Sequence, residues 1–239
     1  LSDLAPVPDL AAGEEWAPAN LTDFDAVLRA VKGADGIVHL GGYSVEGPWP
    51  AILDANIIGA YNLFEAARQA AVKRIVFASS NHAVGFYRRD ETIGVDVTPR
   101  PDSRYGVSKV FGEALAGLYA SKYGAEVLSI RIGNVNEKPL DVRRLSIWIS
   151  PRDLYQLVRI GLERPGLRHE IVYGMSRNGR AWWDNANARR LGYAPRDRAD
   201  DFAAEVLAAH PAKSGDAAAD TYQGGPFCSA ESFDLPAKP

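Results

Sequence analysis

Tyr105 and Lys109 stand four residues apart in a stretch with helical periodicity, so their side chains share one face of a predicted helix. A buried phenol beside an ammonium can act as a general base near neutral pH, because the positive charge lowers its pKa. Upstream, the run Ser79-Ser80 follows a predicted strand, and we expect Ser80 to bind the reacting oxygen. Phenol, ammonium and hydroxyl together favour a hydride-transfer site.

Each of these groups also has an ordinary structural explanation. A tyrosine and a lysine at this spacing can be a helix-surface pair, and a serine after a strand can cap a turn. Capping explains one serine well, but it explains the run Ser-Ser-Asn-His poorly. We therefore expect Asn81 and His82 to face the substrate, although a histidine at a strand end is about as often a structural residue.

Asp3 is expected at the end of a strand, where an acid binds the adenosine ribose and repels a 2′-phosphate, which favours NAD over NADP. Gly41 and Gly42 end a later strand and would line the other side of the cofactor. The nicotinamide cation would join Lys109 in lowering the pKa of Tyr105. The glycine-rich turn that binds pyrophosphate at a helix N-terminus does not occur in this sequence. We expect the sequence to begin partway through a domain.

Arg143 and Arg144 follow in a loop after residue 135. A guanidinium there could hold a substrate carboxylate through two parallel hydrogen bonds. A pair of surface arginines explains the same residues equally well on sequence alone. Trp182 and Trp183 favour packing within a subdomain over stacking on a ligand.

The elements that must position these residues alternate between strand and helix, which is typical of a parallel sheet with helices on both faces. Residues 150–153 read Ser-Pro-Arg-Asp, a helix start with a serine cap and proline in the first turn. From Pro211 onward Ala, Gly, Asp and Pro dominate, which predicts an extended arm. We predict strands over residues 36–40, 74–78, 127–132 and 171–173, and helices over about 53–71, 105–123, 150–165, 183–191 and 201–209.

We expect the 239 residues to form a single domain, because the composition shows no break that demands two. Residues 1–133, with about 150–175, are predicted to form a dinucleotide-binding core that lacks its first strand–helix unit. Residues of about 134–149 and 176–239 are predicted to form the substrate-binding part and a C-terminal arm. A hydrophobic content of 46% and a charged content of 24% are ordinary for a globular protein.

The bulk properties exclude several classes of protein. A net charge of −3 provides no basic face, so we expect no nucleic-acid partner. No apolar run approaches the roughly 20 residues of a membrane helix, so we expect no membrane partner. The single cysteine, Cys228, cannot form an internal disulfide, which favours a cytoplasmic location. We expect no metal, and we expect a homo-oligomer.

Seven segments, taken together, match a known family: GIVHLGGYSVEGPW, NIIGAYNLFEAAR, RIVFASSNHAVGFY, RPDSRYGVSK, RIGNV, the WWDN stretch and the late YQGG. On these segments the sequence resembles the extended short-chain dehydrogenases of the NAD-dependent epimerase/dehydratase family, and within them the bacterial uronate dehydrogenases. The resemblance covers almost the whole sequence from Asp3 onward. Its most specific part is the SSNH run with its flanks.

The resemblance implies a Rossmann-like doubly wound parallel sheet with a small C-terminal substrate-binding subdomain. It also implies NAD-dependent oxidation of free D-glucuronate or D-galacturonate at C1 to the aldarolactone. In that reaction Tyr105 would be the base on the anomeric hydroxyl, Lys109 would hold the nicotinamide ribose, and Arg143 would hold the uronate carboxylate. The implied cofactor residues are Asp3, Asn20, Leu21, Leu40, Gly41, Gly42, Asn56, Tyr105, Lys109 and Ile132, and the implied substrate residues are Ser44, Ser80, Asn81, His82, Tyr105, Asn134 and Arg143.

Two residues depart from the family pattern. Asn20 stands where the family usually has an aspartate near the adenine, and an amide can still form a hydrogen bond there. Asn134 stands where the family has a serine that contacts the substrate. Because asparagine is larger and carries donors as well as an acceptor, the substrate preference could shift.

Other functions stay open on the sequence. A nucleotide-sugar epimerase or dehydratase would use the same catalytic residues, but only about 134 residues follow Tyr105, and Arg143 suits a free uronate better. A dinucleotide-binding sensor without catalysis would not need Ser, Tyr and Lys together. A truncated protein that binds nothing would expose open sheet edges and dissolve poorly.

Overall fold

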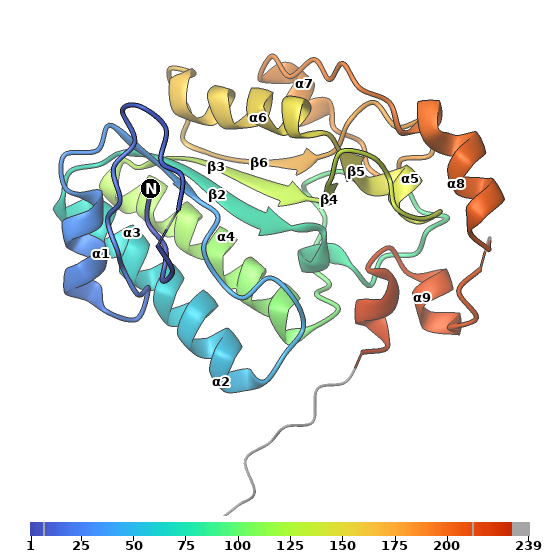
Figure 1. The fold of residues 1–239 in the computed structure, drawn as a ribbon, viewed down its shortest axis with the longest axis horizontal. Coiled ribbons are helices and arrows are strands. Elements are labelled where there is room, and N and C mark those ends of the chain that lie inside the picture. Colours follow the sequence, from blue (N-terminus) through green and yellow to red (C-terminus); the bar gives the residue numbers. More distant parts are fainter. Residues whose placement is uncertain (7, 212, 231–239) are drawn as a thin grey trace, which may run out of the picture.

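The computed structural model describes residues 1–6, 8–211 and 213–230. At its centre lies a parallel sheet with the strand order β1-β2-β3-β6. Helices α1, α3 and α4 cover one face of the sheet, and α6 and α7 cover the other (Figure 1). The strands are β1 (Gly36–His39), β2 (Arg74–Ser80), β3 (Glu126–Ile132) and β6 (His169–Gly174), and the helices are α1 (Phe24–Val31), α3 (Gly59–Gln69), α4 (Arg104–Tyr123), α6 (Pro151–Glu163) and α7 (Ala186–Arg190).

Strand β2 shows why the sheet has two cores. Its side chains alternate, so Ile75 and Phe77 pack under α3 and α4, whereas Val76 packs under α6. A strand that is buried on both faces needs a continuous apolar run, which is how this segment reads in the sequence. The predicted doubly wound parallel sheet is therefore confirmed.

The predicted helices differ from the observed ones mainly at their ends. Ser150 caps α6 as predicted, because its Oγ accepts a hydrogen bond from the Asp153 amide at 3.1 Å. The stretch predicted over 53–71 is preceded by α2 (Trp49–Ile52), starts with a π-helical turn η1 (Leu53–Ile58) and continues as α3. The helix predicted over 183–191 begins later, because Trp183 instead forms a β-bridge with Ile93. Residues 199–209 divide into η3 (Ala199–Phe202) and α8 (Ala203–Ala209).

The extended arm predicted from Pro211 is wrong for the part of it that the structure describes. Residues 217–228 form α9 (Ala217–Thr221) and the 3-10 turn η4 (Gly225–Cys228), which lie beyond the carboxyl ends of the strands (Figure 1). Asp216 caps α9, and the Gly224 amide donates to the Gly85 carbonyl at 2.9 Å. This helix cap and the hydrogen bond between distant parts of the chain, rather than helix propensity, order the segment. Residues 231–239, the rest of the predicted arm, lie outside the described residues.

The N-terminal segment also differs from expectation. The Ala17 and Ala19 amides donate to the carbonyls of Leu1 and Asp3, so the first residues pair with a neighbouring loop. The prediction that Asp3 ends a strand of the sheet is therefore wrong, because residues 1–6 contain no strand. None of the helices in the described ranges is long and apolar enough to cross a membrane.

Candidate active site

The predicted catalytic side chains come together where strands end and α4 begins. Strand β2 ends in Ser79 and Ser80, and the 3-10 turn η2 (Asn81–Val84) follows directly. Ligands of open parallel sheets bind outside the carboxyl ends of the strands. The register of this sheet therefore places the polar run at the end where such a ligand would lie.

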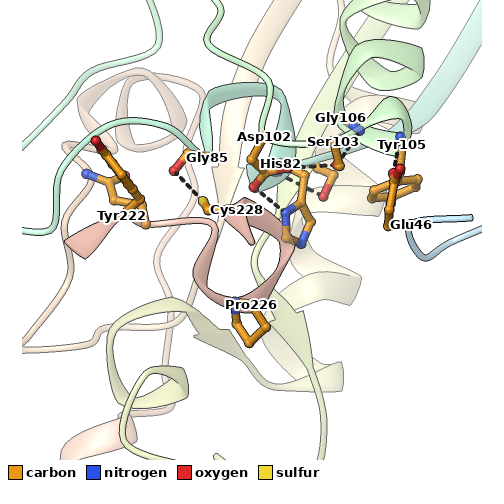
Figure 2. A network of polar contacts seen from close by, with 12 residues as sticks. Glu46, His82, Gly85, Asp102, Ser103, Tyr105, Gly106, Tyr222, Pro226 and Cys228 are labelled. Atoms are coloured by element: carbon orange, nitrogen blue, oxygen red, sulfur yellow. Dashed lines mark hydrogen bonds and ion pairs between the residues drawn. The ribbon is translucent and has the colours of Figure 1, made fainter. Parts of the chain in front are cut away.

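Helix α4 starts beside this polar run and presents Tyr105 to it. Ser103 caps the helix by accepting from the Gly106 amide at 2.9 Å, and Glu46 Oε2 accepts from the Tyr105 amide at 3.1 Å (Figure 2). Ser80 lies near the Tyr105 hydroxyl and acts to lower its pKa. One turn further, Lys109 Nζ lies 5.4 Å from the centroid of the Tyr105 ring and donates to the Ala78 carbonyl at 2.9 Å. The structure thus places the three predicted groups side by side.

The pKa of Tyr105 in the protein alone is raised, not lowered. Burial raises the pKa of Tyr105, and the hydrogen bond from Ser80 opposes that rise only in part. The lowering that we expected from Lys109 is not present within the protein's own groups, because the phenolate loses more hydration than its neighbours restore. Burial also lowers the pKa of Lys109 to about 8, so the ammonium is charged at neutral pH.

His82 lies next to Tyr105 and has a partner that the sequence did not predict. Its Nδ1 is 2.7 Å from Oδ2 of Asp102, and its ring stacks on Phe227 with centroids 3.8 Å apart. Asp102 precedes the cap of α4, where an acid reads as an ordinary helix-start residue. Phe227 belongs to the segment that we predicted to be an extended arm. No local pattern could have found either contact.

Asn81 connects the strand end with the predicted carboxylate-binding arginine. With its amide in the orientation that satisfies both ends, it donates to the Ile132 carbonyl and accepts from Arg143 Nη2, each at 3.1 Å. Arg143 also donates to the Gln223 carbonyl from Nε at 2.9 Å and from Nη2 at 2.8 Å. Burial, together with Arg89 and Arg144, lowers the pKa of Arg143 to about 10, so the cation persists at neutral pH.

Arg144 differs from Arg143 although the two are neighbours. Its guanidinium forms a half-exposed ion pair with Asp141 one helical turn away. Arg143 instead points into the site and is held by Gln223, a residue that the sequence analysis did not select. Gln223 is itself fixed, because its side chain accepts from Trp183 Nε1 at 2.8 Å and donates to the Arg88 carbonyl at 2.8 Å. Trp183 is thus a packing residue, as predicted.

Four of the predicted cofactor residues lie together at the end of β1. They are Leu21, Gly41, Gly42 and Asn56. Asn56 accepts from the Tyr43 amide at 2.7 Å and donates to the Tyr43 carbonyl and to Ser108 Oγ, which fixes the loop after the strand. A Cβ on Gly42 would lie 2.7 Å from Asn56 Oδ1, and the residue has a φ of +133°, so both space and conformation require glycine. A Cβ on Gly41 would contact Leu21 at 3.2 Å. Asn56 therefore positions the loop with its polar atoms.

Leu40 and Ser44 flank the same loop with exposed side chains, whereas Asn20 and Asp3 form local hydrogen bonds. Leu40 is 64% exposed beyond the strand, and Ser44 is exposed in the loop that follows. Asn20 accepts from the amide and hydroxyl of Thr22, and the exposed Asp3 accepts from the Leu4 amide at 2.6 Å. Their contacts with a cofactor or a substrate stay predictions.

Asn134, the predicted substrate residue that departs from the family pattern, lies in β4 (Asn134–Val135). This strand pairs with β5 (Trp148–Ile149), and the short helix α5 (Arg144–Ile147) precedes β5. The Asn134 side-chain oxygen is buried and finds no hydrogen-bond partner among the described residues. A ligand hydroxyl could satisfy this acceptor.

The residues at this end of the sheet fit a nicotinamide dinucleotide. Lys109 Nζ is nine-tenths buried, and one of its three N–H groups is used on the Ala78 carbonyl, so donors remain for ribose hydroxyls. The exposed main chain of Gly41 and Gly42 lets a flat ring or a ribose approach closely. Both features lie at the carboxyl end of adjacent strands.

The comparisons with known proteins agree with this geometry. The model of the "NAD dependent epimerase/dehydratase family" matches residues 4–137. The chain belongs to the NAD-dependent epimerase/dehydratase family. A relative in this family, uronate dehydrogenase of Pseudomonas putida, is 47% identical over 235 residues, which are 98% of this chain and 87% of the relative.

Solved structures give the same result for the fold. A mutant uronate dehydrogenase from Agrobacterium tumefaciens, complexed with NAD, is 43% identical and has a TM-score of 0.94 over 98% of this chain and 88% of its own. Glucuronic acid dehydrogenase from Chromohalobacter salexigens is 46% identical with a TM-score of 0.93, and the match covers 96% of this chain and 86% of that one. The doubly wound sheet of this family member is thus shared with both.

Proposed function

We propose that this protein is an NAD-dependent dehydrogenase that oxidises a free uronic acid, D-glucuronate or D-galacturonate, at C1 to the aldarolactone. The observation that carries the proposal is that Tyr105 and Arg143 both lie against the run 80–82, Tyr105 beside His82 and Arg143 hydrogen-bonded to Asn81. A base and a partly buried cation in one site suit a substrate that carries a hydroxyl at one end and a carboxylate at the other. The relatives named above act on such substrates by their names.

In the proposed reaction, one group of this chain accepts the proton of the anomeric hydroxyl and another stabilises the charge that then develops. Tyr105 accepts the proton of the anomeric hydroxyl, and Ser80 holds the same oxygen through its hydroxyl. Lys109, fixed by the Ala78 carbonyl, supplies the positive charge that stabilises the phenolate during the reaction. When bound, NAD accepts the hydride from C1.

Arg143 binds the uronate carboxylate in this proposal. Its Nε and Nη2 groups already donate to Gln223 and Asn81, and its Nη1 group has no hydrogen bond to the described residues. The guanidinium therefore keeps donors for the substrate while its plane is fixed by the protein. A neutral hexose would leave this partly buried cation without a counter-charge, which costs free energy.

The experiment measures NADH formation by protein expressed from its complete gene, with NAD and, in turn, glucuronate, galacturonate, glucose and UDP-glucuronate. We expect turnover with both free uronates and none with glucose. Conversion of UDP-glucuronate without turnover of the free uronates would contradict the proposal and would favour an epimerase or dehydratase.

We further propose that residues 1–133 with about 150–175 bind the dinucleotide and that 134–149 and 176–239 bind the substrate, within one domain. Exposed apolar side chains on adjacent helices, Tyr61 on α3 and Val107 and Leu118 on α4, support a homo-oligomer. Cys228, a free thiol, suits a cytoplasmic location. Light scattering of the purified protein would test the oligomer, and fractionation of cells would test the location.

A further inference from the structure

Asp102 is a buried carboxylate that the proposed chemistry leaves without a role. Its side chain is 0% exposed, and Oδ2 lies 2.7 Å from Nδ1 of His82 (Figure 2). Ser103 Oγ donates to its other oxygen, Oδ1, at 2.7 Å. Both carboxylate oxygens thus have a partner, and the imidazole contact is the one directed toward the active site.

Two glycines, Gly85 and Gly224, pack against this carboxylate where any side chain would clash with it. A Cβ on Gly85 would lie 1.8 Å from Asp102 Oδ2, and a Cβ on Gly224 would lie 1.9 Å from the same atom. Two segments far apart in the sequence therefore lack side chains at the position that Asp102 occupies. On the other side Phe227 stacks on the His82 ring with an interplanar angle of 23°, which fixes the plane of the imidazole.

The pairing determines which nitrogen of His82 carries the proton. An ionised carboxylate can only accept, so Nδ1 must donate to it, and in a neutral imidazole Nε2 is then an acceptor. Burial lowers the pKa of His82, and Arg143 adds to that effect, whereas Asp102 and Glu46 oppose it. Because burial has the largest effect, the imidazole is neutral near pH 7, and its free nitrogen can accept a hydrogen bond.

We propose that Asp102 is a positioning residue that fixes the tautomer of His82, so that Nε2 of His82 accepts a hydrogen bond from a hydroxyl group of the sugar. The inference rests on the proposed function, because that function supplies a polyhydroxylated substrate. The His82 and Tyr105 rings are 5.7 Å apart between centroids, so the hydroxyl is one near the reacting carbon. The site would then discriminate against sugars that lack this hydroxyl or carry it as an ether.

The first test determines the tautomer directly. The chain contains four histidines, so long-range ¹H–¹⁵N spectra of protein labelled with ¹⁵N-histidine are readily assigned with a His82→Gln variant. At pH 7 and without substrate, we expect Nδ1 of His82 to be protonated and Nε2 to be bare. A proton on Nε2, in either the other tautomer or an imidazolium, would overturn the proposal. This readout does not depend on which sugar the enzyme oxidises.

The second test measures the consequence for recognition. Asp102→Asn has the same shape without the charge, and we expect it to raise KM for the uronate about tenfold, the value of one lost hydrogen bond, with kcat changed far less. The matched control is Asp90→Asn, which removes an exposed carboxylate from the ion pair with Arg88 and should leave both constants unchanged. Wild-type KM in the Asp102→Asn variant would contradict the proposal.

Deoxy analogues distinguish recognition from a general loss of structure. With the 2-deoxy or 3-deoxy uronate, we expect KM of the wild type to rise by the same factor as KM of Asp102→Asn rises with the full substrate. The variant should then show no further loss with that analogue, because the partner of the hydroxyl is already impaired. Equal losses in both proteins for every analogue would overturn the proposal. No turnover of any uronate by the wild type would instead contradict the proposed function, while the tautomer measurement would still test Asp102.

Discussion

At the scale of single residues, the surroundings of Tyr105 explain why one phenol needs so many neighbours. Burial raises its pKa, so the hydroxyl keeps its proton in the protein alone. Ser80 acts to lower this pKa, and Lys109 brings a positive charge to within 5.4 Å of the ring centroid. The base can therefore work only when both act together on the developing phenolate.

Tyr105→Phe removes the proposed base and leaves the ring in place. We expect turnover to fall to background while the affinity for NAD stays within about twofold, because the lost hydroxyl contacts the reacting oxygen. Initial rates of NADH formation and a titration of tryptophan fluorescence with NAD measure the two quantities. Retained turnover would show that another residue is the base.

The lowered pKa of Lys109 predicts that the free energy of unfolding depends on pH. Burial lowers its pKa from 10.5 to about 8, so the folded protein releases this proton at a lower pH than the unfolded chain does. Because the unfolded state binds more protons between those values, this group makes the free energy of unfolding rise as the pH increases from about 8 to 10.5. The full effect is roughly 3 kcal/mol.

Lys109→Met should remove that rise, so urea unfolding between pH 7.5 and 10.5 should show a flatter profile for the variant than for the wild type. Lys122→Met, a change at an exposed lysine near the end of the same helix, is the matched control and should follow the wild-type profile. Parallel profiles for the wild type and Lys109→Met would contradict the assignment.

Arg143→Ala tests the carboxylate-binding residue. We expect KM for the uronate to rise about a hundredfold and kcat to fall much less, because the lost ion pair is present before and during the reaction. Arg144→Ala is the control, since that side chain pairs with Asp141. Steady-state kinetics with both free uronates measure the effect, and an unchanged KM would place the carboxylate elsewhere.

The residues that sequence could predict are those whose spacing follows from one element. Tyr105 and Lys109 share a helical face, and Ser80 ends a strand, so local periodicity was sufficient. The sequence could not predict Asp102 and Gln223, because their partners His82 and Arg143 lie 20 and 80 residues away. The burial that raises the pKa of Tyr105 in the protein alone could not be predicted either, since it is set by the whole fold.

At the scale of elements, helix α4 must be held in one position on the sheet, because it carries both Tyr105 and Lys109. A buried network performs this role: Glu113 on α4 accepts two hydrogen bonds from Arg131 on β3, each at 2.9 Å, and one from Ser79 on β2 at 2.6 Å. Arg131 is 1% exposed. The network therefore joins the helix to the two strands that deliver the site.

Glu113→Gln leaves Arg131 buried without its counter-charge. We expect the free energy of unfolding to fall by about 3 kcal/mol, as found when one partner of a buried ion pair is removed. Glu163→Gln, which changes an exposed pair with Arg159, should cost less than about 0.5 kcal/mol. Urea unfolding of both variants measures the difference, and equal costs would show that the network does not anchor α4.

The sequence could predict the elements that a local pattern determines, but not those that depend on contacts with distant residues. Strands such as β2 are buried on both faces, so their apolar runs were unambiguous. Helix α9 has five residues and depends on the Asp216 cap and on contacts with residues 85–91, which no local pattern encodes. Composition alone therefore suggested an arm where the chain in fact folds back.

At the scale of the whole molecule, the end of the described chain completes the proposed substrate site that the middle of the chain begins. The Gln223 carbonyl holds Arg143, Gly224 makes room for Asp102, and Phe227 stacks on His82. Several residues predicted to contact the dinucleotide, among them Gly41, Gly42 and Lys109, lie instead at the end of β1 and the start of α4. Substrate and cofactor recognition should therefore be separable by a change in the C-terminal segment.

Gly224→Ala is such a change. The φ of Gly224 is −64°, so the backbone accepts alanine, but the new Cβ would lie 1.9 Å from Asp102 Oδ2 and 2.9 Å from Cys228 Sγ. Either Asp102 or the segment must move, and we expect kcat/KM for the uronate to fall at least about tenfold, with a loss of about 1–3 kcal/mol in stability. The affinity for NAD should change much less, because Gly41, Gly42 and Asn56 make their contacts with Leu21, Tyr43 and Ser108 rather than with Asp102.

Gly94→Ala is the matched control, since a Cβ at that position meets no atom within 4 Å. Kinetics with glucuronate and galacturonate, together with NAD titrations on the same preparations, separate the two kinds of recognition. If Gly224→Ala weakened NAD binding as much as uronate turnover, the C-terminal segment would support the fold as a whole. A selective loss with the uronates would instead mean that this segment, which is distant in sequence from Tyr105, belongs to the substrate site.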